Sequence, residues 1–324
     1  MPSTPVKFWS CPDGASGDMR VAQEHLAELQ PTEVLVRHKA VGINFMDLYF
    51  RTGLYPNPGG RLGAEAAGVV EAVGSAVTGF RAGDRVAYAS GPNGAYAEAR
   101  TIDARHLVKI PDGIDFTTAA AMLLKGMTAA MLLTRTTDAR GRRVLFAAAA
   151  GGVGLIAGQW LAHLGAESIG LVSGSGKATA ARAHGYTHVL DGSAVDVGRE
   201  VARLTSGNGV EIAYDGVGEA TFRTSLASLA PRGMFVSFGA ASGPVRDFAI
   251  SMLTPKSLYL TRPTLKHFTD RPDALAALAA QLFEMVGGAK LKAAITTHRF
   301  ADIPKVHQAL TERRTSGSQV IEID

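Results

Sequence analysis

The 324-residue sequence contains a single cysteine, Cys11, so no disulfide can form within the chain. An oxidising compartment is therefore not required, and a cysteine-rich structural zinc lobe is excluded. The sequence also lacks a dense run of basic residues: the nearest grouping is Arg140, Arg142 and Arg143, and the formal net charge is only +4. This charge pattern argues against nucleic-acid binding as the main function.

Long apolar runs are missing as well. The most apolar stretch, Leu145–Trp160, is interrupted by glycines and is shorter than the ~20 residues that a membrane-spanning helix needs. The first ten residues contain no apolar segment of the signal-peptide type. We therefore expect a cytoplasmic protein without a membrane partner. With 46% hydrophobic and 19% charged residues, the chain is long enough to build two globular domains.

The part of the chain up to residue 124 has the pattern of short β-strands. The segment Glu33–Ala40 alternates apolar and polar residues with a period of two, as a half-buried strand does. Further strands are expected at Gly68–Gly74 and, after a Gly83-Asp84 turn, at Arg85–Tyr88. Short strands separated by glycine turns favour a compact, barrel-like domain.

From about residue 125 the pattern changes to alternating helices and strands. The Ala-, Met- and Leu-rich stretch 117–133 predicts one or two helices. Strands are predicted at 144–147, 168–172, 188–190, 211–215 and 234–237, and helices at 153–164, 177–184, 195–204 and 221–229. This alternation predicts a parallel sheet with right-handed crossovers. Beyond residue 262, a helix over 272–286 and one late strand over 319–323 should pack back on the first domain.

The most informative motif is Ala147-Ala148-Ala149-Ala150-Gly151-Gly152-Val153-Gly154. It follows a predicted buried strand and opens a predicted helix. Glycines at this place let the backbone approach a pyrophosphate, and the helix N-terminus offers free N–H donors and the positive end of its dipole. A glycine-rich turn alone is weak evidence, but here the strand, the helix and further β-α units all surround it. The motif predicts a dinucleotide site.

The next predicted strand indicates which dinucleotide. An NAD site usually carries an acidic residue roughly 20 residues after the glycine motif. The corresponding segment, Gly170–Lys177, contains no acid but offers Ser173, Ser175 and Lys177. These side chains can donate to a phosphate group, and Lys177 can also neutralise it. NADP(H) is therefore the predicted cofactor.

Several further motifs occur in a fixed order along the chain. They are Gly42-Ile43-Asn44-Phe45-Met46-Asp47, Gly53-Leu54-Tyr55-Pro56, Gly63-Ala64-Glu65-Ala66-Ala67-Gly68, Tyr214-Asp215, Val236-Ser237-Phe238-Gly239 and Thr261-Arg262-Pro263. Together with the glycine motif, they closely resemble the zinc-free quinone oxidoreductases (zeta-crystallin-like), a branch of the medium-chain dehydrogenase/reductase superfamily. The resemblance runs from about Val34 to the C-terminus and is poor over the first thirty residues.

This resemblance implies an α/β protein with two domains and NADPH between them. The implied domains are a GroES-like β-barrel catalytic domain over 1–124 and 263–324, and a Rossmann doubly wound parallel-sheet domain over 125–262. It also implies a homodimer in which the edge strand Lys256–Thr261 pairs across a two-fold axis.

The resemblance further implies which residues form the site. Asn44 and Tyr55 are the expected catalytic residues, near the nicotinamide and the substrate. The expected cofactor-binding residues are Asn44, Lys125, Thr128, Gly151, Gly152, Val153, Ser173, Lys177, Val217, Phe238, Gly239, Leu260, Thr261, Arg262 and Arg313. In the absence of the resemblance, Asn44, Tyr55 and Arg313 would read as a turn cap, a surface aromatic and a solvated charge.

The sequence departs from related patterns in two places. Gly192 stands where the family often has a tyrosine near the adenosine phosphate, which removes a contact to the cofactor. Zinc-dependent relatives use a cysteine and a Gly-His-Glu motif, but here the stretch Asn44–Asp47 has no cysteine and Ala64 replaces the histidine. Catalytic zinc needs three protein ligands, so we expect no metal.

Without a metal to polarise it, the substrate must already be electrophilic, as quinones and enones are. The expected activity is NADPH-dependent reduction of quinones by hydride transfer from the nicotinamide C4. Tyr55 is a candidate hydrogen-bond donor to the developing oxyanion. The alternatives are an alkenal or enone double-bond reductase, a zinc alcohol dehydrogenase, and a weakly catalytic NADPH-binding or nucleic-acid-binding protein. The physiological acceptor depends on loops such as Arg51–Arg61 and Ser90–Gly94, whose shape the sequence does not give.

Overall fold

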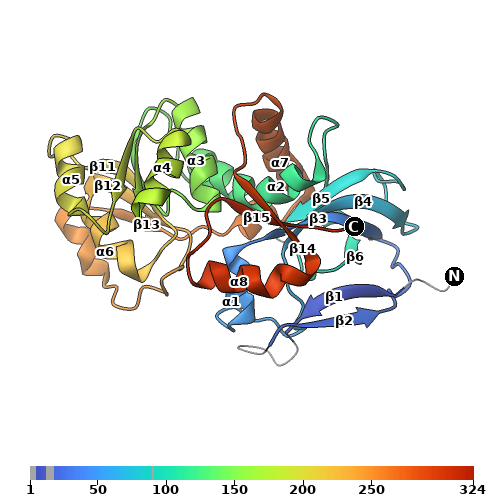
Figure 1. Ribbon diagram of the computed structural model, residues 1–324. Coiled ribbons are helices and arrows are strands. Elements are labelled where there is room, and N and C mark those ends of the chain that lie inside the picture. Colours follow the sequence, from blue (N-terminus) through green and yellow to red (C-terminus); the bar gives the residue numbers. More distant parts are fainter. Residues whose placement is uncertain (1–4, 12–17, 90) are drawn as a thin grey trace. The chain divides into compact units, whose positions relative to one another are not determined.

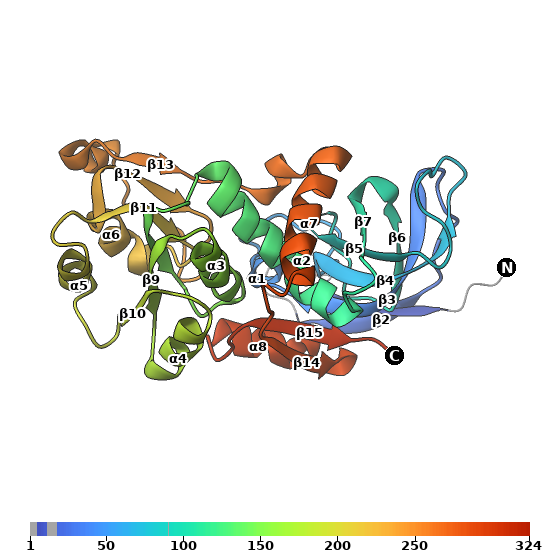
Figure 2. The same ribbon diagram turned by 90° about the horizontal axis from the view of Figure 1, so that it is seen from above.

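The chain divides into two compact units (Figures 1 and 2). The first unit comprises Met1–Leu124, Thr269–Gly287 and Ala293–Asp324, and the second comprises Lys125–Phe268 and Gly288–Lys292. The computed structural model describes residues 5–11, 18–89 and 91–324. Residues 1–4, which belong to the N-terminal stretch considered above, and Ser90, the first residue of one predicted pocket loop, lie outside the described residues.

The first unit is built on a mostly antiparallel sheet. Among the described residues its strands follow the order β14-β15-β3-β4-β5-β7, with β6 paired to β3. The strands are β3 (Glu33–Ile43), β4 (Glu65–Val73), β5 (Arg85–Ala89), β6 (Ala99–Asp103), β7 (Leu107–Lys109), β14 (Ile295–Arg299) and β15 (Ser318–Glu322). A separate antiparallel hairpin consists of β1 (Val6–Ser10) and β2 (Arg20–Glu24). The α-helices that lie wholly in this unit are α1 (Phe45–Arg51), α7 (Pro272–Gly287) and α8 (Ile303–Thr311).

Strand β3 lies inside this sheet, where it pairs with β15, β4 and β6. Val34, Val36 and Ile43 are all fully buried and pack in the core with Val70 of β4 and Ile321 of β15. The pairing of β3 with β15 joins residues 40–43 to residues 319–322, with Gln319 opposite Ile43. Strand β15 thus belongs to the same sheet as β3, and Ala293–Asp324 lies in the first unit.

The same region contains a strand that the sequence pattern did not indicate. One late strand was expected, but β14 precedes it and pairs with it in parallel. Thr296 and Thr297 of β14 are exposed, and the strand lies at the edge of the sheet. An edge strand of this kind has little apolar alternation, so its sequence carries only a weak β signal.

The second unit contains the parallel sheet that the alternating pattern predicts. Its strands follow the order β10-β9-β8-β11-β12-β13 and all neighbouring pairs are parallel. The bounds are β8 (Arg143–Ala147), β9 (Glu167–Val172), β10 (His188–Asp191), β11 (Val210–Asp215), β12 (Leu229–Ser237) and β13 (Tyr259–Thr261). Counted from β8 this is the order 3-2-1-4-5-6 of the Rossmann fold. The predicted fold class is confirmed.

Helices connect these strands close to the predicted positions. They are α3 (Gly152–His163), α4 (Ser175–Ala183), α5 (Val197–Leu204) and α6 (Glu219–Ala227). The core between them and the sheet includes Leu145, Ile169, Phe222, Leu226 and Phe235. Because the central strands are covered on both faces, their sequences read as continuous apolar runs rather than alternating ones.

The predicted edge strand is shorter than expected. It was predicted over Lys256–Thr261, but only Tyr259–Thr261 pairs with β12. Ile250–Lys256 forms a 3₁₀-helix, and Ser257 then takes a left-handed backbone conformation with φ of 50°. This turn consumes the first residues of the predicted strand before the chain reaches the sheet edge.

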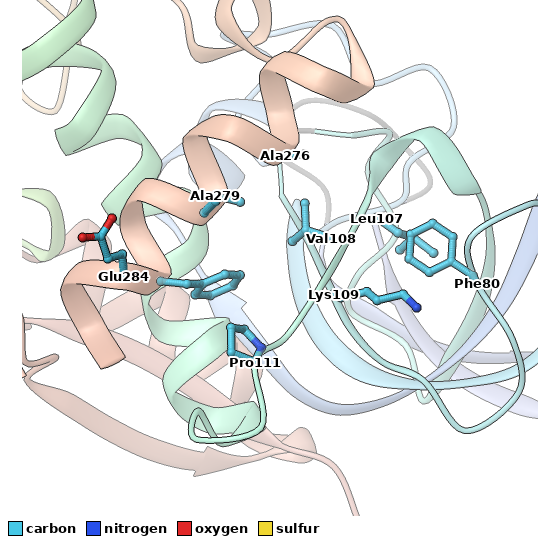
Figure 3. Close-up of a pocket in the computed structure, with 10 residues that line it drawn as sticks. Phe80, Leu107, Val108, Lys109, Pro111, Ala276, Ala279 and Glu284 are labelled. Atoms are coloured by element: carbon cyan, nitrogen blue, oxygen red, sulfur yellow. The ribbon is translucent and has the colours of Figure 1, made fainter. Parts of the chain in front are cut away.

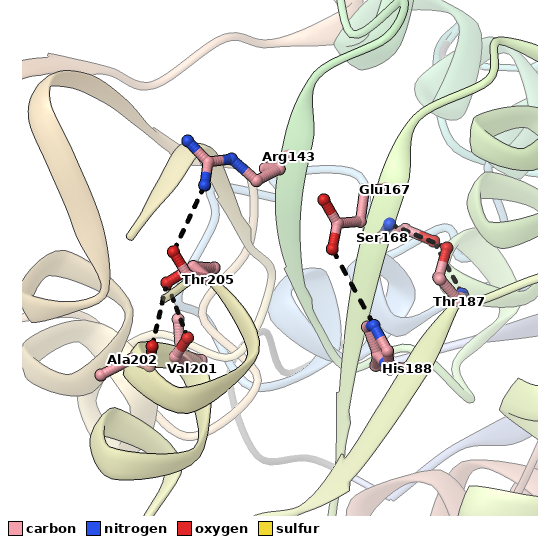
Figure 4. A network of polar contacts seen from close by, with 8 residues as sticks. All are labelled: Arg143, Glu167, Ser168, Thr187, His188, Val201, Ala202 and Thr205. Atoms are coloured by element: carbon pink, nitrogen blue, oxygen red, sulfur yellow. Dashed lines mark hydrogen bonds and ion pairs between the residues drawn. The ribbon is translucent and has the colours of Figure 1, made fainter. Parts of the chain in front are cut away.

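Polar contacts link the amino-terminal ends of neighbouring strands in the parallel sheet (Figure 4). Ser168 and Thr187 exchange two hydrogen bonds of 3.2 Å, each backbone N–H donating to the other hydroxyl. Glu167 and His188, the first residues of β9 and β10, form an ion pair at 3.9 Å when the histidine is protonated. These contacts stabilise the amino-terminal ends of the strands, whereas ligands bind at the carboxyl ends in such folds.

One helical stretch, Phe116–Thr136, has 21 residues and is longer than the Leu145–Trp160 segment singled out in the sequence. It comprises α2 (Phe116–Met131) and a π-helical turn (Leu132–Thr136). By length and composition alone it could cross a membrane. However, 78% of its most apolar window is buried within the fold, which is typical of a core helix.

Candidate functional site

The glycine motif forms the tight connection between β8 and α3. Ala148 has a positive φ of 63°, and Gly151 caps the helix with an extended backbone. A Cβ on Gly154 would overlap the carbonyl oxygens of Ala148 and Ala149, so only glycine lets α3 start this close to the strand. The first N–H groups of α3, at Gly152 and Val153, have no partner within the helix by its geometry. They therefore form a ready site for a pyrophosphate.

A second helix N-terminus lies at the end of the neighbouring strand β9. Ser173 is exposed, Gly174 has a φ of 104°, and α4 begins at Ser175. A Cβ on Gly174 or Gly176 would meet no atom within 4 Å, so the space beside this turn is open. Lys177 lies in the first turn of α4. Hydroxyls, an ammonium group and a helix N-terminus together suit a phosphate monoester.

This turn is fixed by a residue that the sequence did not single out. Asp191, the last residue of β10, accepts a hydrogen bond from the N–H of Gly174 at 2.9 Å and from the N–H of Ser193 at 3.1 Å. These bonds and that from the Ser193 hydroxyl hold the pKa of the Asp191 carboxyl below its usual value. Gly192, the position of the missing family tyrosine, directly follows it. In the sequence, Asp191 is visible only as an acidic residue next to a predicted strand. Its hydrogen-bond partner, Gly174, stands 17 residues earlier, so no local pattern connects the two.

The loop after β11 is positioned by a buried aspartate. The Asp215 carboxylate accepts hydrogen bonds from the N–H groups of Val217 and Gly218, both at 2.9 Å, and from the hydroxyls of Thr221 and Ser225. The predicted site residue Val217 is therefore held rigidly at the carboxyl end of the sheet. Asp215 itself is fully engaged as a cap and is structural.

Phe238 and Gly239 follow β12 at the same edge. The Phe238 ring packs on Phe146 with centroids 5.5 Å apart, and the chain passes so close to Gly216 that a Cβ on Gly239 would overlap its carbonyl oxygen. At the end of β13, the Arg262 guanidinium donates to the Ser237 hydroxyl at 2.9 Å. Leu260 and Thr261 lie within β13.

The remaining two candidates of the second unit lie on α2. Lys125 and Thr128 are three residues apart, so their side chains share one face of the helix. Lys125 is buried and Thr128 is half-buried. A buried ammonium group is costly unless it has polar partners.

In the first unit, Asn44 occupies a buried polar centre. It precedes α1, and its side-chain Nδ2 donates to Glu65 Oε2 at 2.9 Å. The other oxygen of Glu65 accepts the N–H of Leu124 at 2.6 Å. A Cβ on Gly42 would overlap Glu65 Oε2 and the carbonyl oxygen of Ala120. The sequence motifs around Gly42, Asn44 and Glu65 are thus parts of one structure, in which the carboxylate orients the asparagine amide.

A chain of buried hydrogen bonds supports Asn44 from the other side. The N–H of Asn44 donates to Asp47 Oδ2 at 2.8 Å, and the Tyr96 hydroxyl donates to the same oxygen at 2.8 Å. His307 Nε2 lies 2.8 Å from the Tyr96 hydroxyl. Burial, followed by the charge of Arg51, lowers the pKa of His307 to about 3, so this histidine is neutral. No sequence pattern indicates Tyr96 or His307, which are 211 residues apart.

The other two candidates of the first unit lie nearer the surface. Tyr55 is half-buried and packs edge-on against Tyr49 and Phe50, with ring centroids 5.2 and 5.7 Å away. Arg313 follows α8 in a left-handed turn with φ of 56° and is exposed. Their predicted roles stay predictions.

A hollow of about 520 Å³ in the first unit contains none of the predicted site residues (Figure 3). It lies between α7 and the β7 region and is mostly apolar, with Lys109 and Glu284 as its charged members. The described residues contain no group of three or more His, Cys, Asp or Glu side chains that could hold a metal ion.

Comparison with known proteins places this architecture. Residues 30–112 match the alcohol dehydrogenase GroES-like domain, and residues 152–281 match the domain described as zinc-binding dehydrogenase. A quinone oxidoreductase of Pseudomonas aeruginosa is 50% identical over 91% of this chain and 92% of its own length. A 2-haloacrylate reductase of Burkholderia is 38% identical over 90% of this chain and 91% of its own.

A solved structure extends the comparison to three dimensions. The quinone oxidoreductase of Escherichia coli, solved in complex with NADPH, has a TM-score of 0.94 and 37% identity, covering 98% of this chain and 99% of that one. The fold and the glycine motif define the class as a medium-chain dehydrogenase/reductase. Within this superfamily the chain belongs to the quinone oxidoreductase family. The resemblance noted in the sequence is confirmed.

Proposed function

We propose that this protein is an NADPH-dependent quinone oxidoreductase that works without zinc. The proposal is carried by two features, a dinucleotide loop at Gly151–Gly154 and an Asn44–Glu65 centre. In this centre the stretch Asn44–Asp47 has no cysteine and Ala64 replaces the histidine of the zinc enzymes. The quinone oxidoreductase relatives, at up to 50% identity, support the same activity.

The chain's own residues fit NADPH. The N–H groups of Gly152 and Val153 suit the pyrophosphate, and Gly151 is proposed to border it as the N-cap of α3. Ser173 and Lys177 suit the 2′-phosphate beside the open turn at Gly174. Residues proposed for the nicotinamide half are Asn44, Lys125, Thr128, Val217, Phe238, Gly239, Leu260, Thr261, Arg262 and Arg313. When bound, NADPH supplies the hydride; the protein supplies orientation and a site that excludes water.

The residues of the first unit orient the reaction. Glu65 holds the Asn44 amide in one direction, which lets Asn44 present a fixed group to the nicotinamide and substrate. Tyr55 is proposed to donate a hydrogen bond to the oxygen of the substrate that gains charge. No carboxyl or imidazole is required as a general acid, because a reduced quinone takes protons from water. A Tyr55→Phe variant with unchanged quinone turnover would remove Tyr55 from this role.

We further propose a homodimer that forms through the outer edge of β13. Tyr259 and Leu260 are 59% and 38% exposed there, and an unpaired sheet edge with apolar side chains favours pairing with a second copy. The proposed location is the cytoplasm, in keeping with the single cysteine and the absence of any disulfide requirement.

The test is a comparison of NADPH and NADH oxidation by the purified protein with a small quinone, with and without a metal chelator. Chelator-resistant activity that prefers NADPH is the expected result. Activity that the chelator abolishes would contradict zinc independence. Tight NADPH binding without turnover of any quinone or enone would contradict the enzymatic role.

A second candidate is reduction of an activated carbon–carbon double bond. It is favoured by the 38% identity to a 2-haloacrylate reductase, which covers nearly the whole of both chains. Both reactions use the same hydride donor and an acceptor that is already electrophilic. A panel of quinones, enones and 2-haloacrylates under the same conditions separates them by their kcat/KM values.

A further inference from the structure

The Asp47–Tyr96–His307 chain is the least expected feature of the first unit. Its three members come from α1, from the segment before β6, and from α8, and α1 and α8 lie side by side (Figure 1). All three side chains are fully buried. Burying three polar groups is costly unless they make specific hydrogen bonds, so this arrangement needs a reason beyond packing.

The direction of each hydrogen bond can be assigned. The Tyr96 hydroxyl carries a single proton, which it donates to Asp47 Oδ2. The hydroxyl oxygen then accepts from His307 Nε2, which fixes the histidine proton on that nitrogen. His307 Nδ1 has no hydrogen-bond partner among the described residues, which agrees with a bare lone pair there rather than a buried N–H donor.

This network of hydrogen bonds ends at Asn44. Asp47 Oδ2 accepts both the Tyr96 hydroxyl and the N–H of Asn44, so the tyrosine and the asparagine backbone share one oxygen. A Cβ on Gly63 would overlap the Tyr96 ring, so the glycine just before Ala64-Glu65 leaves the space that the ring fills. Asn44 is thus fixed twice, through its side chain by Glu65 and through its backbone by Asp47.

We propose that Tyr96 and His307 are positioning residues for hydride transfer, acting through Asp47 to hold Asn44 in its reactive orientation. The inference rests on the proposed place of Asn44 beside the nicotinamide. Small displacements of orienting groups reduce rates strongly, up to about 100-fold for a 1 Å shift, so removal of this support should lower kcat more than cofactor binding.

The first unit contains a matched control. Tyr88 and His38 form a second fully buried tyrosine–histidine pair, with the hydroxyl 3.0 Å from His38 Nε2 and ring centroids 5.8 Å apart. The corresponding values for Tyr96 and His307 are 2.8 Å and 5.5 Å. The hydrogen bonds of the His38–Tyr88 pair do not involve Asn44 or Asp47. Tyr88→Phe and Tyr96→Phe therefore each remove one buried tyrosine hydroxyl that contacts a histidine, and only Tyr96→Phe removes a donor to Asp47.

The first measurement follows hydrogen exchange of the Asn44 amide, which needs no activity. Tyr96→Phe should speed this exchange by about 10-fold or more, because Asp47 loses its second donor, whereas Tyr88→Phe should leave it near the wild-type rate. Equal acceleration in both variants would show general loosening of the unit and overturn the inference. So would an unchanged rate in Tyr96→Phe.

The second measurement is a double-mutant cycle on kcat with NADPH and a small quinone. Tyr96→Phe should lower kcat about 10-fold with KM for NADPH within about twofold, and should have no further effect when Asn44 is already alanine. His307→Gln, which keeps an N–H donor, should retain most of the activity that His307→Leu loses. An equal fall in both backgrounds would overturn the inference. If the wild type reduces no quinone, the proposed function fails and the exchange rates alone decide the positioning role.

Discussion

Lys177 is the residue on which the choice of cofactor depends. It is the only charged side chain of Gly170–Lys177, in the first turn of α4 beside an open space. Lys177→Ala should raise the Kd for NADPH about 10-fold, since a charge-assisted contact contributes ~1.5–3 kcal/mol and this side chain is partly exposed. The Kd for NADH should stay constant. Fluorescence titration with both cofactors measures this, and Lys177→Arg serves as the control that keeps the charge. Equal loss of affinity for both cofactors would contradict contact with the 2′-phosphate.

Gly42 shows how one missing side chain shapes the Asn44 centre. Alanine there would place its Cβ against Glu65 Oε2 and the Ala120 carbonyl oxygen, and backbone atoms cannot easily move away. Gly42→Ala should lower the free energy of unfolding by ~1–3 kcal/mol and reduce quinone turnover. Gly113→Ala is the control, because its Cβ would meet no atom within 4 Å. Urea denaturation of both variants measures the difference; equal stability would show that β3 can shift to make room.

At the level of single residues, the sequence predicts contacts that are local and misses those that are not. Gly154 and Lys177 stand within a few residues of the helix starts that give them meaning, so the strand–loop–helix pattern finds them. Asp191 acts on Gly174, and His307 acts on Tyr96, across separations that depend on the folded sheets. No periodicity in the chain encodes such distant pairs.

Among the elements, β13 is an edge strand with no strand paired to its outer side in the described chain. It is the last strand of the parallel sheet, and its outer edge carries Tyr259 and Leu260. Leu260→Lys should convert the proposed homodimer to a monomer. The two-fold axis would place one buried, unpaired charge from each copy at the interface, and this is costly. Sedimentation velocity at several concentrations measures this. Val195→Lys, at a 40% exposed position before α5, should leave the mass of the sedimenting species equal to that of the wild type. A wild type that sediments as a monomer would contradict the proposal.

The central strands of the parallel sheet were predicted well and edge strands poorly. The central strands β8, β9 and β11 lie within a residue or two of their predicted bounds, because burial on both faces gives a continuous apolar run. The exposed edge strand β14 was missed and β13 was predicted too long. At an edge, pairing is decided by where the chain arrives, as at the left-handed Ser257, and less by side-chain pattern.

For the whole molecule, the two buried histidines predict a marked loss of stability in mild acid. Burial lowers the pKa of His38 to about 4 from 6.5, opposed in part by its bond to the Ala97 carbonyl, and lowers that of His307 to about 3. The unfolded chain takes up protons at these groups below pH ~6.5, whereas the folded chain does not until the lower values are reached. Stability is therefore complete above pH ~6.5 and falls as the pH drops toward 4.

The size of this effect can be estimated and its source isolated. Two extra protons bound by the unfolded state give a slope of up to ~2.7 kcal/mol per pH unit, and the partly buried His106, whose pKa is also lowered, adds in the same direction. Carboxylates with lowered pKa values, such as Asp84 and Asp302, lose their contribution only below about pH 4, so they do not act in this window.

Urea denaturation at pH 7.5, 6.0 and 5.0 should show a steadily falling midpoint. The His38→Gln variant should have a lower free energy of unfolding at pH 7.5 than the wild type. As the pH falls, its free energy of unfolding should decrease roughly half as steeply as that of the wild type. A wild-type midpoint that stays constant from pH 7.5 to 5.0 would mean that these histidines ionise in the folded protein, and thus that the cores around them admit water.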